Sequence, residues 1–321
     1  MLKHSAEWAT RCMHEAKTHQ HNCWITLTYR DEALPSRYHT GLIHPVTKRP
    51  IYGGTLHKLH MQKFYRKIRK HLSRNNPEIL HSDSAAVDYF AAGQKIIDNS
   101  NSTPILRYYY SGEYGEKYKR PHYHACLFGI DFRDKKIIKH TAQQHRLYES
   151  ETLQLMWPHG QAVLSELTWE TAAYTARYTL AKVKGAGQNQ VREYKQHNKT
   201  IRKTHYEQID YETGEIITLE PEFNDMSRKP GIGAYWLQKW EKDVYKTNTS
   251  SVRIRGNKTQ PPRYYDKLHK KNNPEHHKHI QKERAKATVK NWLQNLQPRL
   301  DAEEIITTAK ITTLRQHMET K

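Results

Sequence analysis

The strongest constraint on the fold of this chain is a pair of β-rich runs separated by a short segment that contains glycine. Residues 104–111 (PILRYYYS) and 123–130 (YHACLFGI) are rich in the aromatic and branched residues that favour strands. Only residues 112–122 lie between them. Short glycine-bearing connections between strand-like runs are typical of β-hairpins. The sequence therefore predicts an antiparallel pair of strands.

Further elements are predicted on both sides of this pair. Residues 23–29 (CWITLTY) have the composition of another strand, and residues 55–73 place apolar side chains at helical spacing among lysines and arginines. Farther along, residues 141–156 and 169–183 predict helices, and residues 161–167 predict a strand. This β-α-β-β-α-β-α order predicts an α+β fold in which helices pack on an antiparallel sheet.

The charge of the chain predicts a polyanionic partner. Lysine and arginine total 53 against 33 aspartates and glutamates, which gives a formal net charge of +20. Such a charge attracts nucleic acid or an anionic membrane surface. The sequence has neither a long apolar run nor a signal-like start, so we expect a soluble cytoplasmic protein without a membrane partner, with basic amphipathic membrane binding as the alternative. The 21 tyrosines offer rings on which single-stranded nucleic acid can stack.

Three cysteines without a CxxC pair argue against a disulfide framework or a thiolate zinc site, and predict reduced, packed thiols.

Composition also predicts how the chain is divided. Glycines before residue 190 end the first block, so residues 1–190 are expected to form one domain. Residues 191–275 would be a basic region that completes this domain or binds DNA, with a hairpin turning at residues 212–215. Residues 276–321 have the composition of a charged helical tail. Residues 228–290 carry 17 lysines and arginines against 5 aspartates and glutamates, so the second half of the chain is the basic one.

The predicted strand at 123–130 begins beside a candidate metal site. Side chains at i and i+2 of a strand point the same way, so His122 and His124 would present both imidazoles on one face with Tyr123 turned away. In a chain with 22 histidines, a chance HxH is the alternative. Glu113 lies where a hairpin would bring its carboxylate opposite the histidines as a third ligand. Glu116 is the competing choice, and either glutamate could be a solvated turn residue.

Two imidazoles and a carboxylate would leave coordination positions open for substrate and water. Imidazole ligands favour Mn²⁺ by softness, whereas availability favours Mg²⁺, so both metals remain candidates. Either would polarise a phosphoryl oxygen as a Lewis acid.

A pair of tyrosines on the predicted helix 169–183 offers a nucleophile. Tyr174 and Tyr178 are four residues apart, so their rings project from one face, and Lys182 continues this stripe. A phenol with a pKa of about 10 attacks only when the phosphate is polarised and the phenolate is stabilised. Lys182 would steady the phosphate or the phenolate, whereas Arg177 points elsewhere. Core packing is the alternative reading of two tyrosines at this spacing.

Together these segments resemble the replication initiation proteins of gokushoviruses, which are small single-stranded DNA phages, within the HUH endonuclease superfamily. The resemblance covers about residues 20–270, and the matching motifs are ITLTY at 25–29, SGEYG at 111–115, RPHYHACLFG at 120–129, AYTARY at 173–178, EFNDMSRKPGIG at 222–233 and PPRYYD at 261–266.

The resemblance implies a ferredoxin-like core and rolling-circle replication in the cytoplasm of a bacterial host. It implies that one tyrosine attacks a phosphodiester at the origin and stays joined to the 5′ end, leaving a 3′ hydroxyl for the host polymerase. The second tyrosine then repeats the attack, and the strand is closed into a circle. The chain has no GxxxxGK[ST] motif, so a host helicase is implied.

Two other functions compete with this one. A non-catalytic single-stranded DNA-binding protein would use the same basic and aromatic surface but would not need the histidines, the glutamate and the tyrosines together. An HUH relaxase or transposase would share the chemistry on another substrate, and the GIG and PPRYYD segments favour the phage initiator.

Overall fold

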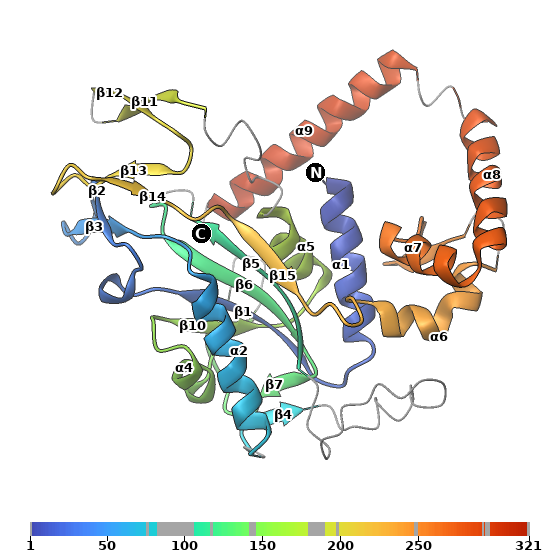
Figure 1. The fold of residues 1–321 in the computed structure, drawn as a ribbon, viewed down its shortest axis with the longest axis horizontal. Coiled ribbons are helices and arrows are strands. Elements are labelled where there is room, and N and C mark those ends of the chain that lie inside the picture. The colour runs from blue at the N-terminus through green and yellow to red at the C-terminus, as the bar shows by residue number, and fades with distance from the viewer. Residues whose placement is uncertain are drawn as a thin grey trace. The chain divides into compact units, whose positions relative to one another are not determined.

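A seven-stranded antiparallel sheet forms the centre of the fold (Figure 1). The computed structural model describes residues 2–74, 77–81, 106–115, 118–140, 146–178, 190–196, 199–246, 250–290, 292 and 296–319. In spatial order the strands of the sheet are β15 (Phe223–Met226), β5 (Arg107–Tyr114), β6 (Pro121–Phe128), β1 (Asn22–Thr28), β10 (Ala162–Ser165), β9 (Arg146–Glu149) and β8 (Lys136–His140).

One face of the sheet is covered by α2 (Lys58–Leu72) and the short α4 (Glu151–Met156). The buried side chains of α2 recur every three or four residues, as expected of an amphipathic helix packed on a core; they are Met61, Phe64, Tyr65, Ile68 and Leu72. They meet the odd-numbered residues of β1, Cys23, Ile25 and Leu27, in the larger hydrophobic core.

The other face is covered by α1 (Leu2–Ala16) and α5 (Trp169–Tyr178), as Figure 1 shows. A second core forms here from small residues of the two helices and from even-numbered residues of β6; its members include Ala9, Cys12, Ala172, Ala173, Ala176, Cys126 and Phe128. The three cysteines of the chain are free and buried, which confirms the prediction of packed thiols.

A buried ion pair joins α1 to β5 and to the segment after β15. Glu15 is fully buried and pairs with Arg107, and one of its oxygens also accepts the backbone N–H of Gly233 at 2.6 Å. Arg107 in turn donates to the carbonyl oxygen of Pro230 at 2.8 Å. These bonds tie residues far apart in the sequence to one face of the sheet.

The chain divides into two compact units, residues 1–236 and residues 237–321. The first unit also holds η1 (Asp31–Ala33) and four two-stranded pairs, which are β2 (Tyr38–Ile43) with β3 (Pro50–Gly53), β4 (Ile79–His81) with β7 (Ile130–Phe132), β11 (Arg192–Gln196) with β12 (Lys199–Lys203), and β13 (Glu207–Ile209) with β14 (Ile216–Thr218).

The second unit takes most of α6 (Ala234–Val244) and continues with β16 (Val252–Ile254), β17 (Asn257–Thr259), α7 (Arg263–Asn272), α8 (Pro274–Lys290) and α9 (Gln297–Glu319). Its interior is largely polar. The ring of His269 stacks on Tyr245 at 3.9 Å between centroids, and Arg284 pairs with Asp266 at 2.7 Å.

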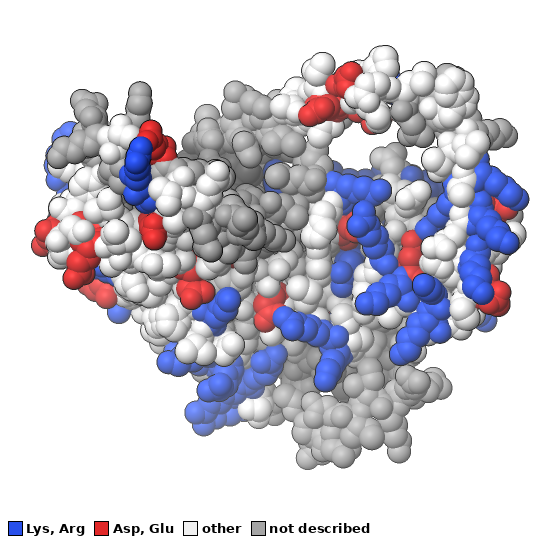
Figure 2. All heavy atoms as spheres, turned by 45° about the horizontal axis from the view of Figure 1, so that its top comes forward, with Lys and Arg blue, Asp and Glu red and all other residues white. Residues whose placement is uncertain are grey.

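The structure confirms the predicted α+β class with helices on an antiparallel sheet. The predicted strands at 23–29, 104–111, 123–130 and 161–167 correspond to β1, β5, β6 and β10, and the helix at 55–73 corresponds to α2. The helix predicted at 141–156 is wrong over residues 146–149, which form β9, and only residues 151–156 are helical. Among the described helices, none is both long and apolar enough to cross a membrane. Figure 2 shows more lysine and arginine than aspartate and glutamate on the surface, as the net charge requires.

Candidate metal centre and tyrosine helix

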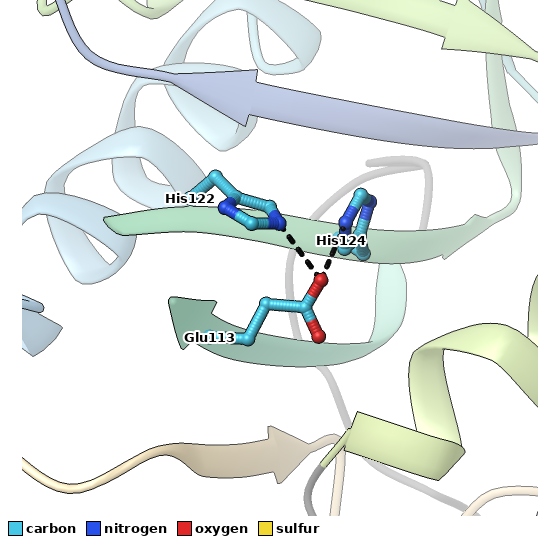
Figure 3. A group of neighbouring side chains, drawn as sticks. All are labelled: Glu113, His122 and His124. Carbon is cyan, nitrogen blue, oxygen red and sulfur yellow. Dashed lines mark hydrogen bonds and ion pairs between the residues drawn. The ribbon is translucent and has the colours of Figure 1, made fainter. Parts of the chain in front are cut away.

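The register of β5 and β6 brings Glu113, His122 and His124 together. His122 and His124 share one face of β6, while Tyr123 between them lies in the core under α2. Glu113 is directly opposite His122 in the strand pair. Both imidazoles point at the Glu113 carboxylate, whose Oε1 is 2.8 Å from His122 Nε2 and 2.9 Å from His124 Nε2 (Figure 3). Glu116, the competing choice, lies outside the described residues.

These three groups fit a divalent cation. Their ligand atoms all lie within 4.8 Å of one another, and no other such group occurs in the described part of the chain. Glu113 Oε2 and His124 Nε2 are buried and have no hydrogen-bond partner. Buried polar atoms are normally satisfied, and a cation bound between the carboxylate and the imidazoles would satisfy both.

The other nitrogen of each ring is held by a neighbouring oxygen. His122 Nδ1 lies 3.1 Å from the carbonyl oxygen of Arg120, to which it donates, and His124 Nδ1 lies 3.0 Å from Thr26 Oγ1. Arg120 is itself fixed by a 2.5 Å contact with Asp31. Such bonds orient metal-binding histidines and leave Nε2 to face the ion.

Burial and mutual attraction set the ionisation of the three groups. Burial works to raise the pKa of Glu113, but the nearby His124 and His122 outweigh it, so the pKa lies below its ordinary value. Burial works to lower the pKa of His122, yet Glu113 outweighs it and the net pKa is raised. At His124 burial dominates and the pKa is lowered. An ionised carboxylate and a neutral imidazole are the forms in which these groups bind metals.

Trp24 connects the histidine side of the sheet to α5. Its ring stacks on His124, with centroids 5.0 Å apart and planes 6° apart. Its indole N–H donates to Thr175 Oγ1 of α5 at 2.9 Å. Thr175 is fully buried and its hydroxyl donates to the carbonyl oxygen of Thr171 within the same helix. A strand residue next to the candidate metal ligands thus fixes the tyrosine helix.

Tyr174 lies next to the candidate metal centre. Its ring meets that of His124 edge to face, with centroids 4.8 Å apart, and meets Trp24 at 6.0 Å. Its neighbours Ala173 and Ala176 face the core instead. Tyr178 is the last residue of α5, one turn farther along, and nothing is described of its side chain. Lys182 and the rest of the helix predicted to reach residue 183 lie outside the described residues.

Sequence reasoning did not identify Trp24, Thr26 and Thr175 as parts of the site. The alternation of residues 23–29 was a usable signal, because even-numbered residues of β1 share the face of the histidines, with Thr26 opposite His124. No pattern in the sequence pairs Trp24 with Thr175, which lies 151 residues away.

Comparison with known proteins identifies relatives over most of the chain. The model of the replication-associated protein ORF2 family matches residues 22–184. Replication-associated protein VP4 of Bdellovibrio phage phiMH2K is 26% identical over 276 residues, which is 85% of this chain and 66% of that protein. Replication-associated protein ORF2 of Spiroplasma virus 4 is 27% identical over 269 residues, 83% of this chain and 63% of that protein. The chain thus spans just under two thirds of the length of either relative. No solved structure matches it.

Proposed function

The chain belongs to the ORF2 family of replication-associated proteins, and on that premise we propose that it initiates replication of a small phage genome by nicking and rejoining single-stranded DNA. The names of its two relatives, both replication-associated proteins of phages, support a role in replication. The proposed enzyme is a metal-dependent, site-specific endonuclease and strand transferase of the HUH type, acting at the phage origin in the cytoplasm of a bacterial host.

The observation that carries this proposal is the contact between Tyr174 and His124. A phenol 4.8 Å, centroid to centroid, from an imidazole of a candidate metal site lies where a phosphate could contact both. A bound Mg²⁺ or Mn²⁺, held by His122, His124 and Glu113, would polarise a phosphoryl oxygen as a Lewis acid. An unassisted phenol, with a pKa of about 10, would be a poor nucleophile.

In the proposed reaction the tyrosine oxygen attacks a phosphorus atom of the origin strand. The new O–P bond joins the tyrosine to the 5′ phosphate, and the bond from phosphorus to the 3′ oxygen breaks. The phenol loses its proton to solvent, and the departing 3′ oxygen gains one, so the charges balance. Since one phosphodiester replaces another, joining the ends later needs no ATP.

Two tyrosines one turn apart suit an alternating mechanism. While one of Tyr174 and Tyr178 holds a covalent 5′ end, the other is available to cut the regenerated origin. The freed 3′ hydroxyl then attacks the first phosphotyrosine and closes the displaced strand. Lys182, one further turn along the sequence, is proposed to neutralise the phosphate or the phenolate. A host polymerase would extend the 3′ end, and a host helicase would separate the strands.

The test is to incubate the purified chain with labelled single-stranded DNA from its own genome, with Mn²⁺, with Mg²⁺ or with EDTA. We expect a protein–DNA adduct on denaturing gels only when metal is present. Single Tyr174→Phe and Tyr178→Phe variants should still nick but fail to join strands, and the double variant should form no adduct. Binding of origin DNA without any adduct would instead indicate a non-catalytic single-stranded DNA-binding protein. Preference for a transfer origin would indicate a relaxase.

A further inference from the structure

Three histidine rings form a continuous stack on the α2 side of the first unit. His57 lies on His60 with centroids 4.3 Å apart and planes at 19°, and His60 lies on His159 at 4.0 Å and 12°. All three side chains are partly exposed. We call His57, His60 and His159 the histidine stack. Two of these residues lie at the start of α2 and the third precedes β10, so the fold assembles the stack from distant segments.

The core holds the stack in place. His60 Nδ1 is 2.8 Å from the hydroxyl of Tyr29, which lies 3.0 Å from the hydroxyl of Tyr123. The Tyr123 hydroxyl accepts the backbone N–H of His57 at 2.8 Å. The carbonyl oxygen of His159 accepts the N–H of Arg30 at 2.9 Å, which fixes the third ring at the end of β1. The rings are therefore preorganised and need little ordering when a ligand binds.

The geometry of the stack suits a flat ligand and not a metal ion. Parallel rings present faces, and their nitrogens do not converge on one point. Among the described residues, only Glu113, His122 and His124 form a group with convergent ligand atoms. Aromatic faces that are partly open to solvent are the surfaces on which unpaired nucleobases stack.

Positive charge surrounds the stack. Helix α2 contains six lysines and arginines and no acidic residue. Lys63 and Lys67, both exposed, take part in none of the ion pairs among the described residues. Burial first, and then His159, His57 and Lys63, lower the pKa of His60 to about 4. The pKa of His159 is lowered by burial and by Lys67, Lys63 and Arg30. Figure 2 shows lysines and arginines gathered toward its lower left, where α2 lies in Figure 1.

We propose that the histidine stack, with Lys63 and Lys67, is a second binding surface for unpaired DNA, on the face of the sheet opposite the candidate metal centre. A base would stack on an outer imidazole, and the flanking phosphates would contact the lysines. Neutral rings among cations match a nucleotide, which is a flat base attached to an anion.

The position of this surface fits a strand that continues past the candidate metal centre. Tyr29, which supports the stack, directly follows Thr28, and Thr28 is opposite His122 in the sheet. Odd-numbered residues of β1 face α2, whereas Trp24 and Thr26 face the metal side. Both sites therefore lie at the same end of β1 and β6. The proposal concerns binding alone and holds whether or not the chain cuts DNA.

The test measures binding of fluorescent (dT)20 and of a duplex of equal length by anisotropy, in EDTA so that no cleavage contributes. We expect Lys63→Gln/Lys67→Gln to weaken (dT)20 binding and to reduce the slope of log K against log salt by about 1.4, as two lost phosphate contacts on a single strand predict. Lys136→Gln/Lys139→Gln on β8 removes the same charge elsewhere and should leave affinity within about twofold if the site is local.

The rings are tested with His57→Ala/His159→Ala, which keeps the His60 bond to Tyr29. We expect about tenfold weaker binding of (dT)20 with the salt slope unchanged, because stacking releases no counterions, and unchanged binding of duplex. An unchanged near-ultraviolet circular dichroism spectrum would show that the fold is intact, and exposed His140→Ala is the matched control. Wild-type affinity in the ring variant, or equal losses for (dT)20 and duplex, would overturn the proposal.

Discussion

His124 is held on three sides by residues of different elements. Trp24 stacks on its ring, Thr26 binds its Nδ1, and Tyr174 meets its face from α5. The residue pattern of β6 was enough to predict the histidine pair, and the hairpin was enough to place Glu113. The sequence could not predict Trp24 as the brace, because its two partners come from β6 and α5.

The candidate metal ligands lead to the first prediction. His122→Ala should abolish the metal-dependent adduct, because it removes one of the three groups that fit the cation. DNA binding should persist through the basic surface. Mn²⁺ binding measured by calorimetry, together with anisotropy on DNA, would check this, and exposed His140→Ala is the control. Cleavage at the wild-type rate in His122→Ala would disprove the assignment of the metal centre.

The brace leads to the second prediction. Thr175→Val keeps the shape of the side chain but leaves the buried indole N–H of Trp24 without its acceptor, at a cost of about 1–3 kcal/mol in stability. Adduct formation should slow about tenfold, while Mn²⁺ affinity stays unchanged, because Tyr174 loses its alignment and the ligands do not. Thr175→Ser restores the acceptor and should restore the rate. Equal losses in Thr175→Ser would show that the hydroxyl is not responsible.

At the scale of elements, periodicity predicted α2, β1, β5, β6 and β10 well because each buries one face. It failed at residues 146–149, which were expected to be helical. Tyr148 pairs with Leu164 of β10, and Leu147 pairs with Ser165, so β9 forms because an adjacent strand supplies its hydrogen bonds. Local composition cannot show such pairing, which overrides helix propensity.

The attachment of α1 to the sheet leads to the third prediction. Burial works to raise the pKa of Glu15, but His19, Arg107 and the N–H of Gly233 outweigh it, and the pKa is lowered. Its contribution to stability is therefore present at neutral pH and is lost as the pH falls through the folded-state value. Glu15→Gln should destabilise the first unit by about 3–5 kcal/mol at pH 7, because it leaves Arg107 buried and unpaired.

Denaturant titrations of the wild type and Glu15→Gln between pH 7 and pH 3 would measure this difference. We expect the gap in the free energy of unfolding to narrow as the pH falls. Glu32→Gln, at an exposed glutamate, should leave stability nearly unchanged. A gap that stays constant with pH would contradict the account of Glu15.

At the scale of the whole molecule, the predicted division at residues 190 and 275 remains a prediction, and the structure groups residues 1–236 as one compact unit. Strand β15 pairs with β5, Ile232 lies in the second core, and Gly233 binds Glu15. Such long-range contacts have no signature in composition. Glycine content and charge gave boundaries only where composition changes.

These contacts lead to the fourth prediction, which concerns fragments. A fragment of residues 1–190 lacks β15 and the partners of Glu15 that follow it, so it should melt at a lower temperature than a fragment of residues 1–244, which ends with α6. Thermal melts followed by circular dichroism would compare them. If the shorter fragment melts as high as the longer one, residues 191–236 are dispensable and the predicted domain of residues 1–190 stands alone.

The most direct measurement of the central claim is to identify the residue that becomes joined to DNA. Trypsin cuts after Arg177, so Tyr174 falls in the peptide of residues 147–177 and Tyr178 in that of residues 178–182. After reaction with origin DNA and Mn²⁺ followed by nuclease digestion, mass spectrometry should find a nucleotide on one of these two peptides, attached through a 5′ phosphate to tyrosine. A nucleotide on any other residue, or cut DNA without a covalent adduct, would contradict the account.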